Sequence, residues 1–326
     1  MDKNLTDQNL NYYIKRFTSL RIDKAHGQAP YQPLLLLSLI ELVEQGLISE
    51  NRFTISPEMI SIFIKYRDCL STDSHRANPA QPFYHMSRPD KAFWHLVPIP
   101  GHEKVLSSGG KLNTLKKLRE NVLYGYFDDE LFNLLQIPDC RNSLTYALID
   151  KWFPDKFAQI QELLKIHSYD QFRFALREKG GAVYTVEELK REDEAEAYRR
   201  SATFRKEVLA LYDQRCAFCR LRVISQDSEN IVDGSHILPF SIFRDDRYDN
   251  GLSLCKNHHW AFDHGWFSIS DEYTIIIPEN RIHEEPPIDT KPMQAFHNEP
   301  IFLPNQIEFY PRLEAIQWHR ERWKIA

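Results

Sequence analysis

The chain has 326 residues, of which 42% are hydrophobic and 13% aromatic, and its formal net charge is −5. These values predict a globular protein of two or three domains and exclude a fibrous or disordered chain. No apolar run approaches the roughly 18 residues of a membrane span, and the start MDKNLTDQNL is unlike a secretory signal, so we expect a cytoplasmic protein without membrane contact. The acidic charge neither supports nor excludes nucleic acid as a partner, because phosphate contact needs only a local basic surface.

The first half of the chain is predicted to be mainly helical. Apolar residues at helical spacing predict a helix over residues 8–25, and the apolar run after Pro33 predicts a second helix that begins at this proline. Further helices are expected over 56–70, 128–137 and 142–153. Residues 82–86 and 93–97 have the pattern of two short strands joined in a hairpin. We therefore predict a helical domain with a small sheet over residues 1–165.

A connecting segment is expected over residues 166–213. Gly180-Gly181 and mixed polarity predict a linker over 166–185. Residues 185–213 are expected to form one helix, whose acidic first half and basic second half complement the helix dipole. The second domain then covers 214–326, with a strand over 273–278 that extends its sheet and a terminal helix over 311–323.

The cysteines indicate a metal site rather than disulfides. The chain has five, an odd number, and three of them belong to two short motifs. These motifs are Cys216-x-x-Cys219 and Cys255-x-x-His258, which can close a tetrahedral Zn²⁺ site of the Cys₃His type. Because protein fills all four positions, the zinc is expected to be structural.

A second set of polar residues is interleaved with the zinc motifs. His236 follows a strand-like run, and Asn250 begins another. His259 opens a predicted short helix, and Asp263 lies four residues later. Residues at this spacing share one helix face, so His259 and Asp263 can reach the same cation.

These residues resemble the HNH nucleases with the ββα-metal fold. The matching motifs are Ser235-His236-Ile237-x-Pro239, Asn250-Gly251-Leu252-x-Leu254, and His258/His259 through Phe262-Asp263-x-Gly265. The resemblance implies that His236 is the general base and that Asn250 orients His236 or holds the loop behind it. It also implies that His259, helped by Asp263, binds Mg²⁺ or Mn²⁺ at the scissile phosphate.

One position departs from the pattern of this family. Many HNH enzymes carry Asp or His immediately before the base as a further metal ligand, where this chain has Ser235. Asp233 lies three residues before the base, a separation that points to the opposite face of a regular strand. Asp249 and Asp263 are the other ligand candidates, and Asp263 has the better spacing.

The first half of the chain has a resemblance of its own. Four stretches resemble the sulfur-binding domain joined to HNH nucleases in McrA-like restriction enzymes, namely residues 29–37, 82–86, 93–96 and 128–154. Such domains recognise phosphorothioate DNA, and the resemblance implies an apolar wall and a set of polar DNA contacts. Pro82 and Phe83 would form the wall, and the polar contacts would come from His26, Gln28, Tyr31, Gln32 and His85. Phe93 and Trp94 are expected in the core. Gln81 replaces an expected aromatic residue, which leaves a modified base as the alternative target.

Together these observations predict an α+β protein, with a helical N-terminal domain and a C-terminal ββα-metal nuclease domain stabilised by zinc. The function expected from the resemblances is a Type IV-like, modification-dependent restriction endonuclease that cuts double-stranded DNA to leave 5′-phosphates. Two alternatives stay open: an HNH nuclease whose N-terminal domain senses a protein or nucleotide signal, and a catalytically inactive zinc protein that binds DNA. Cleavage of both strands by an enzyme with one site suggests a homodimer.

Overall fold

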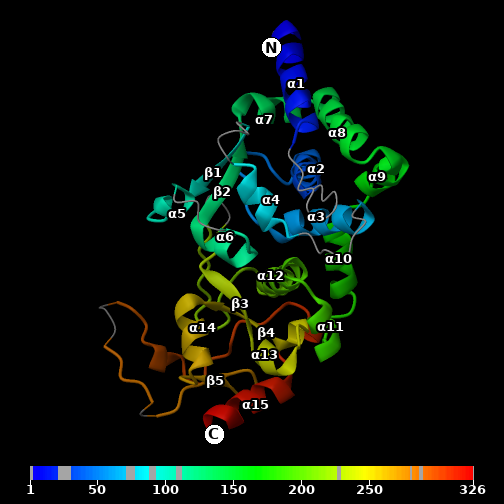
Figure 1. Cartoon of the computed structure of the whole chain (residues 1–326). Coiled ribbons are helices and arrows are strands. Elements are labelled where there is room, and N and C mark those ends of the chain that lie inside the picture. The colour runs from blue at the N-terminus through cyan, green and yellow to red at the C-terminus, as the bar shows by residue number, and fades with distance from the viewer. Residues whose placement is uncertain are drawn as a thin grey trace. The chain divides into compact units, whose positions relative to one another are not determined.

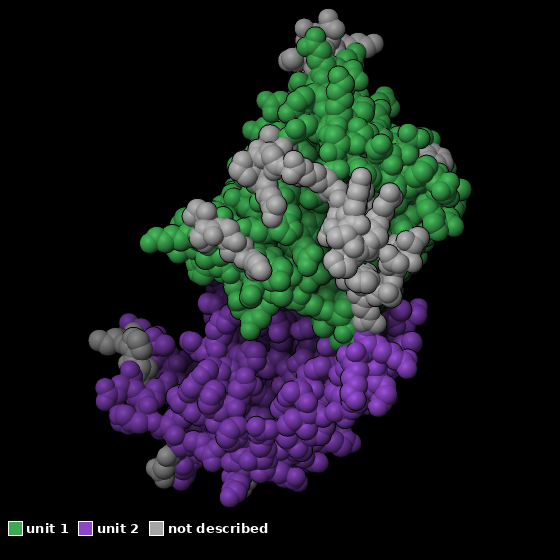
Figure 2. Space-filling view, in the orientation of Figure 1, with its two compact units in different colours: residues 1–172, 192–199 green, residues 173–191, 200–326 purple. Residues whose placement is uncertain are grey.

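The computed structural model describes residues 3–20, 31–70, 78–87, 93–107, 112–225, 229–279, 281–285 and 289–325. The chain divides into two compact units (Figure 2): unit 1 comprises residues 1–172 and 192–199, and unit 2 comprises 173–191 and 200–326. Helices combined with small antiparallel sheets confirm the predicted α+β class (Figure 1). Among the described residues, no helix is both long and apolar enough to cross a membrane.

Unit 1 is a helical body with one two-stranded sheet. Helix α2 lies at its centre, and its residues 33–43 are all buried because the run of leucines is apolar on every face. The elements that build this unit are α1 (Lys3–Thr18), α2 (Tyr31–Glu44), α3 (Pro57–Leu70), α4 (Ala80–His85), β1 (Trp94–Pro98), α5 (Glu103–Ser107), α6 (Leu115–Asn121), β2 (Val122–Phe127), α7 (Asp129–Gln136), α8 (Pro138–Trp152), the 3₁₀ turn η1 (Pro154–Lys156), α9 (Phe157–Leu164) and the start of α10 (Ser168–Arg177).

The helices expected over 56–70, 128–137 and 142–153 are confirmed by α3, α7 and α8. The first helix begins earlier than expected, at Lys3, and residues 21–25 of its expected range lie outside the described residues. The second begins at Tyr31, so Pro33 occupies its first turn rather than its first position. Proline is tolerated there because the first amide groups of a helix have no partner within the helix.

The hairpin expected from residues 82–86 and 93–97 is wrong. Residues 82–86 belong to helix α4 and its end, and Ala80, Phe83 and Met86 are buried at a spacing of three, which a helix directs to one face. Strand β1 instead pairs with β2, in the antiparallel register Trp94↔Phe127. Because β2 comes later in the chain, no local pattern indicated this partner.

One charged pair is buried inside unit 1. Lys65 Nζ donates to both oxygens of Glu41, at 2.6 and 2.8 Å, and to the carbonyl of Leu163 at 2.8 Å. Tyr66 donates its hydroxyl to the same carboxylate at 2.5 Å. The pair therefore joins α2 and α3 to the end of α9 while every charge in it has a partner.

Unit 2 is built around a β-hairpin followed by a helix. Strand β3 (Val232–His236) pairs antiparallel with β4 (Gly251–Cys255), and α14 (Lys256–Asp263) follows directly. The remaining elements are α11 (Val186–Arg191), α12 (Glu194–Leu211), α13 (Phe240–Phe243), β5 (Ser268–Ile269), β6 (Ile275–Ile276), α15 (Leu313–Trp323) and the 3₁₀ turns η2 (Tyr248–Asn250), η3 (Met293–Phe296) and η4 (Ile307–Phe309). Helix α12 contributes residues 194–199 to unit 1 and 200–211 to unit 2.

Three expectations for this half of the chain are wrong. Residues 185–213 form two helices, because the Asp193 carboxylate accepts hydrogen bonds from the amides of Ala195 and Glu196, each at 2.9 Å, and so caps the start of α12. The strand expected to extend the main sheet is β6, which pairs with β5 in a separate two-stranded sheet. The segment 166–185, expected as a linker, contains helix α10.

Candidate active site

The cysteine and histidine motifs meet at one point in unit 2. The ligand atoms of Cys216, Cys219, Cys255 and His258 all lie within 4.8 Å of one another. His258 Nδ1 is 3.0 Å from the sulfur of Cys255 and 3.7 Å from that of Cys216. Zinc bonds of about 2.3 Å to sulfur and about 2.0 Å to nitrogen place tetrahedral ligands at comparable separations. The set can therefore hold a structural metal such as zinc.

Two hydrogen bonds hold the first of these motifs against β4. The amide of Ala217 donates to the carbonyl of Ser253 at 2.6 Å, and the Ser253 hydroxyl donates to the carbonyl of Arg215 at 2.7 Å. Phe218, between the two cysteines, is buried and stacks on the His258 ring at 4.0 Å.

Protons and a metal compete for this set. Burial disfavours a charged imidazole, but the Cys219 and Cys255 sulfurs outweigh it and raise the pKa of His258 to about 9. Metal binding needs a neutral histidine and thiolates, so it must displace protons from these side chains.

Two glycines allow helix α12 to pack directly on the β3–β4 hairpin. A Cβ on Gly234 would lie 2.9 Å from the backbone of Arg205, and one on Gly251 would lie 2.4 Å from Val208 Cγ2. Side chains at either position would push the helix away. This close packing brings Phe204 of α12 onto the His236 ring, with centroids 3.9 Å apart and planes 3° from parallel.

His236, the last residue of β3, has a buried acidic partner. Its Nε2 lies 2.7 Å from Asp246 Oδ1, and the other oxygen of Asp246 accepts a hydrogen bond from Arg200 Nη1 at 2.7 Å. Asp246 is 4% exposed and Arg200 is 9% exposed. Sequence reasoning missed both residues. The only signal for Asp246 was an acidic pair between the two motifs, and nothing near Arg200 in the sequence indicated its role.

Asn250 contacts the loop between β3 and β4. Its side-chain amide donates to the carbonyls of Leu238 and Asp245 at 3.1 and 2.9 Å, and its side-chain oxygen accepts from the amide of Leu238 at 2.8 Å. Asn250 is completely buried. Of the two roles expected for it, these contacts correspond to holding the loop behind His236.

The loop that carries Asp246 is also held by a segment expected to be a linker. Residues 180–184 run antiparallel to residues 244–248, with hydrogen bonds from Asp246 N to Ala182 O at 2.8 Å and from Tyr184 N to Arg244 O at 2.9 Å. Gly181 adopts a φ of +100°, and a Cβ there would lie 2.3 Å from the carbonyl oxygen of Asp246. Only glycine fits this approach.

The neighbouring acidic residues of the loop are committed to arginines. Arg312 donates to Asp249 Oδ1 at 2.7 Å and to Asp245 Oδ2 at 2.5 Å, and Arg247 also pairs with Asp245. Despite burial, the hydrogen bond from Arg247 and the charges of both arginines lower the pKa of Asp245. Asp249, one of the expected alternative metal ligands, is therefore occupied by an ion pair.

His259 and Asp263 lie on one face of α14, as their spacing predicted. His259 Nε2 is 3.5 Å from Asp263 Oδ2, and Asp263 interacts electrostatically with His236 as well. Ser235 is buried, and Asp233 accepts a hydrogen bond from the amide of Gly234 at 2.9 Å. In the described part of the chain, the Cys₃His set is the only group of three or more His, Cys, Asp or Glu side chains whose ligand atoms lie within 4.8 Å of one another.

Of the five polar residues expected to contact DNA, three belong to the described part of unit 1. His26 and Gln28 fall outside the described residues. Tyr31 and Gln32 begin α2, His85 ends α4, and all three are half-buried. The apolar wall was expected from Pro82 and Phe83, and the core from Phe93 and Trp94.

All four of these apolar side chains are buried. Phe83 is 1% exposed, packs edge-on against Trp94 at 5.0 Å, and accepts the Trp94 indole hydrogen bond on its carbonyl at 2.9 Å. Contact between the Phe83 ring and DNA would therefore require this side chain to leave the core.

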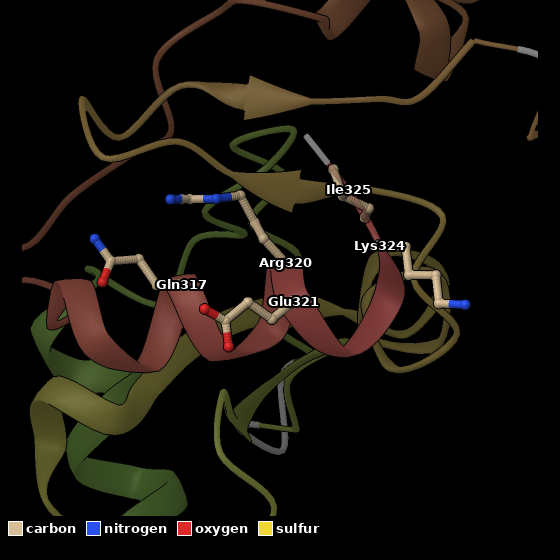
Figure 3. A pocket seen from close by; sticks show the side chains of 5 residues that line it. All are labelled: Gln317, Arg320, Glu321, Lys324 and Ile325. Carbon is tan, nitrogen blue, oxygen red and sulfur yellow. The ribbon is translucent and has the colours of Figure 1, made fainter.

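A separate pocket lies on helix α15 (Figure 3), lined by Gln317, Arg320, Glu321, Lys324 and Ile325. Arg320 is held by the carbonyl of Ile269 at 2.7 Å and by Asp271 at 2.5 Å. No candidate catalytic residue lines this pocket, so it belongs to the surface of the C-terminal helix.

Comparison with known proteins identifies one segment. Residues 216–270 match a family described as HNH endonuclease. No curated protein matches the chain. Among solved structures, a modification-dependent TagI restriction endonuclease is similar at 23% identity and a TM-score of 0.28, over 37% of this chain and 37% of that chain. The matched segment contains the Cys₃His set and the His236, Asn250 and His259 motifs in their expected order. Residues 216–270 are therefore similar in sequence to the HNH endonuclease family.

Proposed function

We propose that this chain is a metal-dependent endonuclease in which His236 is the general base. The observation that carries the proposal is the way in which the imidazole is held. Nε2 faces the buried Asp246 carboxylate at 2.7 Å, whereas Nδ1 has no hydrogen-bond partner among the described residues. The side chain keeps 21% of its surface exposed. An ionised carboxylate can only accept a hydrogen bond, so this arrangement favours the tautomer with the proton on Nε2 and leaves the lone pair on Nδ1.

The reaction follows from this tautomer. Nδ1 takes a proton from a water molecule, and the hydroxide attacks the phosphorus of the scissile diester. The bond from phosphorus to the 3′ oxygen breaks, which leaves a 5′-phosphate and, after protonation from solvent, a 3′-hydroxyl. His259 and Asp263 would hold a divalent cation, Mg²⁺ or Mn²⁺, whose Lewis acidity stabilises the charge that develops on the phosphate. Asn250 keeps the loop that carries Asp246 in place.

Zn²⁺ is the proposed occupant of the Cys₃His set. Its four protein ligands leave no position for a reacting water, so its role is to hold the first motif, β4 and α14 together. His258 and His259 are adjacent in α14 yet serve different metals in this proposal.

We further propose that unit 1 directs the nuclease to modified double-stranded DNA, with phosphorothioate as the first candidate. This proposal is supported by the resemblance to sulfur-binding domains, which covers residues 29–37, 82–86, 93–96 and 128–154. Tyr31, Gln32 and His85 are the described polar candidates, with His26 and Gln28 as sequence-based additions. HNH sites contact mainly phosphate, so selectivity must come from another part of the chain. A restriction role, cytoplasmic location and homodimeric assembly are part of the same proposal.

Plasmid cleavage with Mg²⁺ or Mn²⁺ tests the catalytic part. Wild type is expected to cut, and His236→Ala to lose about 100-fold or more of the rate, since a general base contributes on this order. The matched control is His283→Ala, because His283 is 88% exposed and pairs only with Glu285 in the described structure. Equal rates for wild type and His236→Ala would refute the role of His236, and no cleavage on any DNA substrate would favour the inactive DNA-binding alternative.

Binding by the full-length His236→Ala protein tests the reader. Duplexes that carry phosphorothioate, methylcytosine or hydroxymethylcytosine are compared with an unmodified duplex of the same sequence. Tighter binding to one modified duplex supports the proposal and names the target. Equal affinity for all four would exclude modification-dependence and favour the alternative in which unit 1 senses a protein or nucleotide.

A further inference from the structure

We infer that helix α12 completes the nuclease site, with Arg200 positioning His236 through Asp246 and Phe204 fixing the plane of the imidazole. Both residues precede the segment 216–270 that matches the HNH family. The inference rests on the proposed role of His236 as the base. It assigns positioning residues for that base, and neither of them touches the substrate.

The contacts form a single chain from helix to imidazole. Arg200 Nη1 donates to Asp246 Oδ2 at 2.7 Å, and Asp246 Oδ1 faces His236 Nε2 at 2.7 Å. Each carboxylate oxygen therefore has one partner, and rotation of the carboxylate would break both contacts. All three residues belong to unit 2.

The Arg200 guanidinium itself lies against two aromatic rings. It lies 4.1 Å from the centroid of Phe240 and 5.3 Å from that of Tyr184. Arginine favours such stacking because its guanidinium is planar and weakly hydrated. Contact with both rings restricts the positions that the guanidinium can take beside Asp246.

Phe204 restricts the tilt of the His236 ring. It lies four residues after Arg200, on the same face of α12, and stacks on His236 with planes 3° apart. The hydrogen bond to Asp246 fixes which imidazole edge points inward, and the stack fixes the tilt of the ring. Together they aim Nδ1 away from Asp246.

Stability alone is a poor account of this arrangement. A buried ion pair contributes little net stability, because desolvation offsets the attraction between its charges. The same helix carries another ion pair, in which Glu207 pairs with Arg173 and Arg177 of α10, and in the described structure Glu207 forms no ion pair with a candidate catalytic residue. Loss of Arg173 supplies a control for the removal of an arginine partner from α12.

The kinetic test compares full-length Arg200→Gln, Arg200→Lys and Arg173→Gln with wild type on plasmid DNA. We expect Arg200→Gln to lower kcat by about 10-fold to 100-fold with KM unchanged, because the base is mispositioned while DNA binding is intact. Arg200→Lys, which keeps the charge, should recover part of the loss. Arg173→Gln should keep the wild-type kcat. A kcat for Arg200→Gln equal to that of Arg173→Gln would overturn the inference.

The spectroscopic test reads the tautomer of His236 by ¹⁵N-resolved NMR, with His236→Ala used for assignment. Wild type is expected to carry the proton on Nε2. Asp246→Asn should shift the population toward Nδ1–H, because its amide group can donate to Nε2. A folded Asp246→Asn protein with an unchanged tautomer would overturn the inference. This measurement needs no cleavage, so it separates a failure of the positioning inference from a failure of the proposed nuclease function.

Discussion

His319 joins α15 to the helix that carries the proposed metal ligands, and it does so in its neutral form. Its Nδ1 accepts from the Ser268 hydroxyl at 2.9 Å, and its Nε2–H donates to the carbonyl of Phe262 at 3.0 Å. The ring stacks on Phe262 at 3.8 Å and is 3% exposed. Burial lowers the pKa of His319 to about 4. Protonation would therefore favour the unfolded chain over the folded one.

The size of the effect follows from the two pKa values. An unfolded histidine titrates near 6.5, so between pH 6.5 and 4 the unfolded chain binds a proton that the folded chain does not. The contribution of His319 to the unfolding free energy is complete above pH 6.5 and decreases as the pH falls toward 4. A pKa lowered from about 6.5 to about 4 corresponds to about 3 kcal/mol in all, of which about 2 kcal/mol is lost at pH 5.

Urea unfolding at pH 7.5 and pH 5.0, followed by tryptophan fluorescence, measures this loss for wild type and His319→Gln. Other groups titrate in both proteins, so the difference between their pH slopes isolates His319. Wild type should lose about 2 kcal/mol more than the variant between the two pH values. If both proteins lose the same free energy, the neutral buried histidine is not a source of pH dependence and the reasoning is refuted.

Three further predictions concern packing, metal and buried charge. Gly251→Ala should destabilise unit 2 by about 1 to 3 kcal/mol, since its Cβ would lie 2.4 Å from Val208 Cγ2, and a second change, Val208→Ala, should restore stability in thermal unfolding. Cys219→Ser should lose bound zinc by elemental analysis and lower the melting temperature; a variant that retains zinc would contradict the assigned ligand set. Lys65→Met should lower the free energy of unfolding by about 3 to 5 kcal/mol, because it leaves the buried Glu41 carboxylate without a counter-charge. The double variant Lys65→Met with Glu41→Leu should recover most of this loss in urea unfolding.

Local spacing was sufficient to predict two side-chain groupings in unit 2. Two pairs of residues, each with two residues between its members, predicted the Cys₃His set, and the i, i+4 spacing of His259 and Asp263 predicted their shared helix face. Such features depend on tight turns and on helical periodicity, which the sequence encodes within a few residues. The α+β class was predictable for the same reason.

Local patterns failed where a partner is distant in the chain. The run at 82–86 looked like one strand of a hairpin, yet β1 takes its partner from 122–127 and leaves 82–86 to a helix. Strand pairing is settled by which segments the whole core brings together, and short apolar runs do not distinguish a strand from a buried helix turn.

The sequence by itself determined which residues form the Cys₃His set and the motifs of His236, Asn250 and His259. Only the tertiary structure decided what holds His236. Its acidic partner, Asp246, lies 10 residues along the chain, and Arg200 reaches that carboxylate from 46 residues away. The physical reason is that the orientation of a catalytic side chain depends on hydrogen bonds and stacking from several elements at once. No spacing within one segment encodes that arrangement, because α12, the 180–184 segment and the β3–β4 loop meet only after the chain has folded.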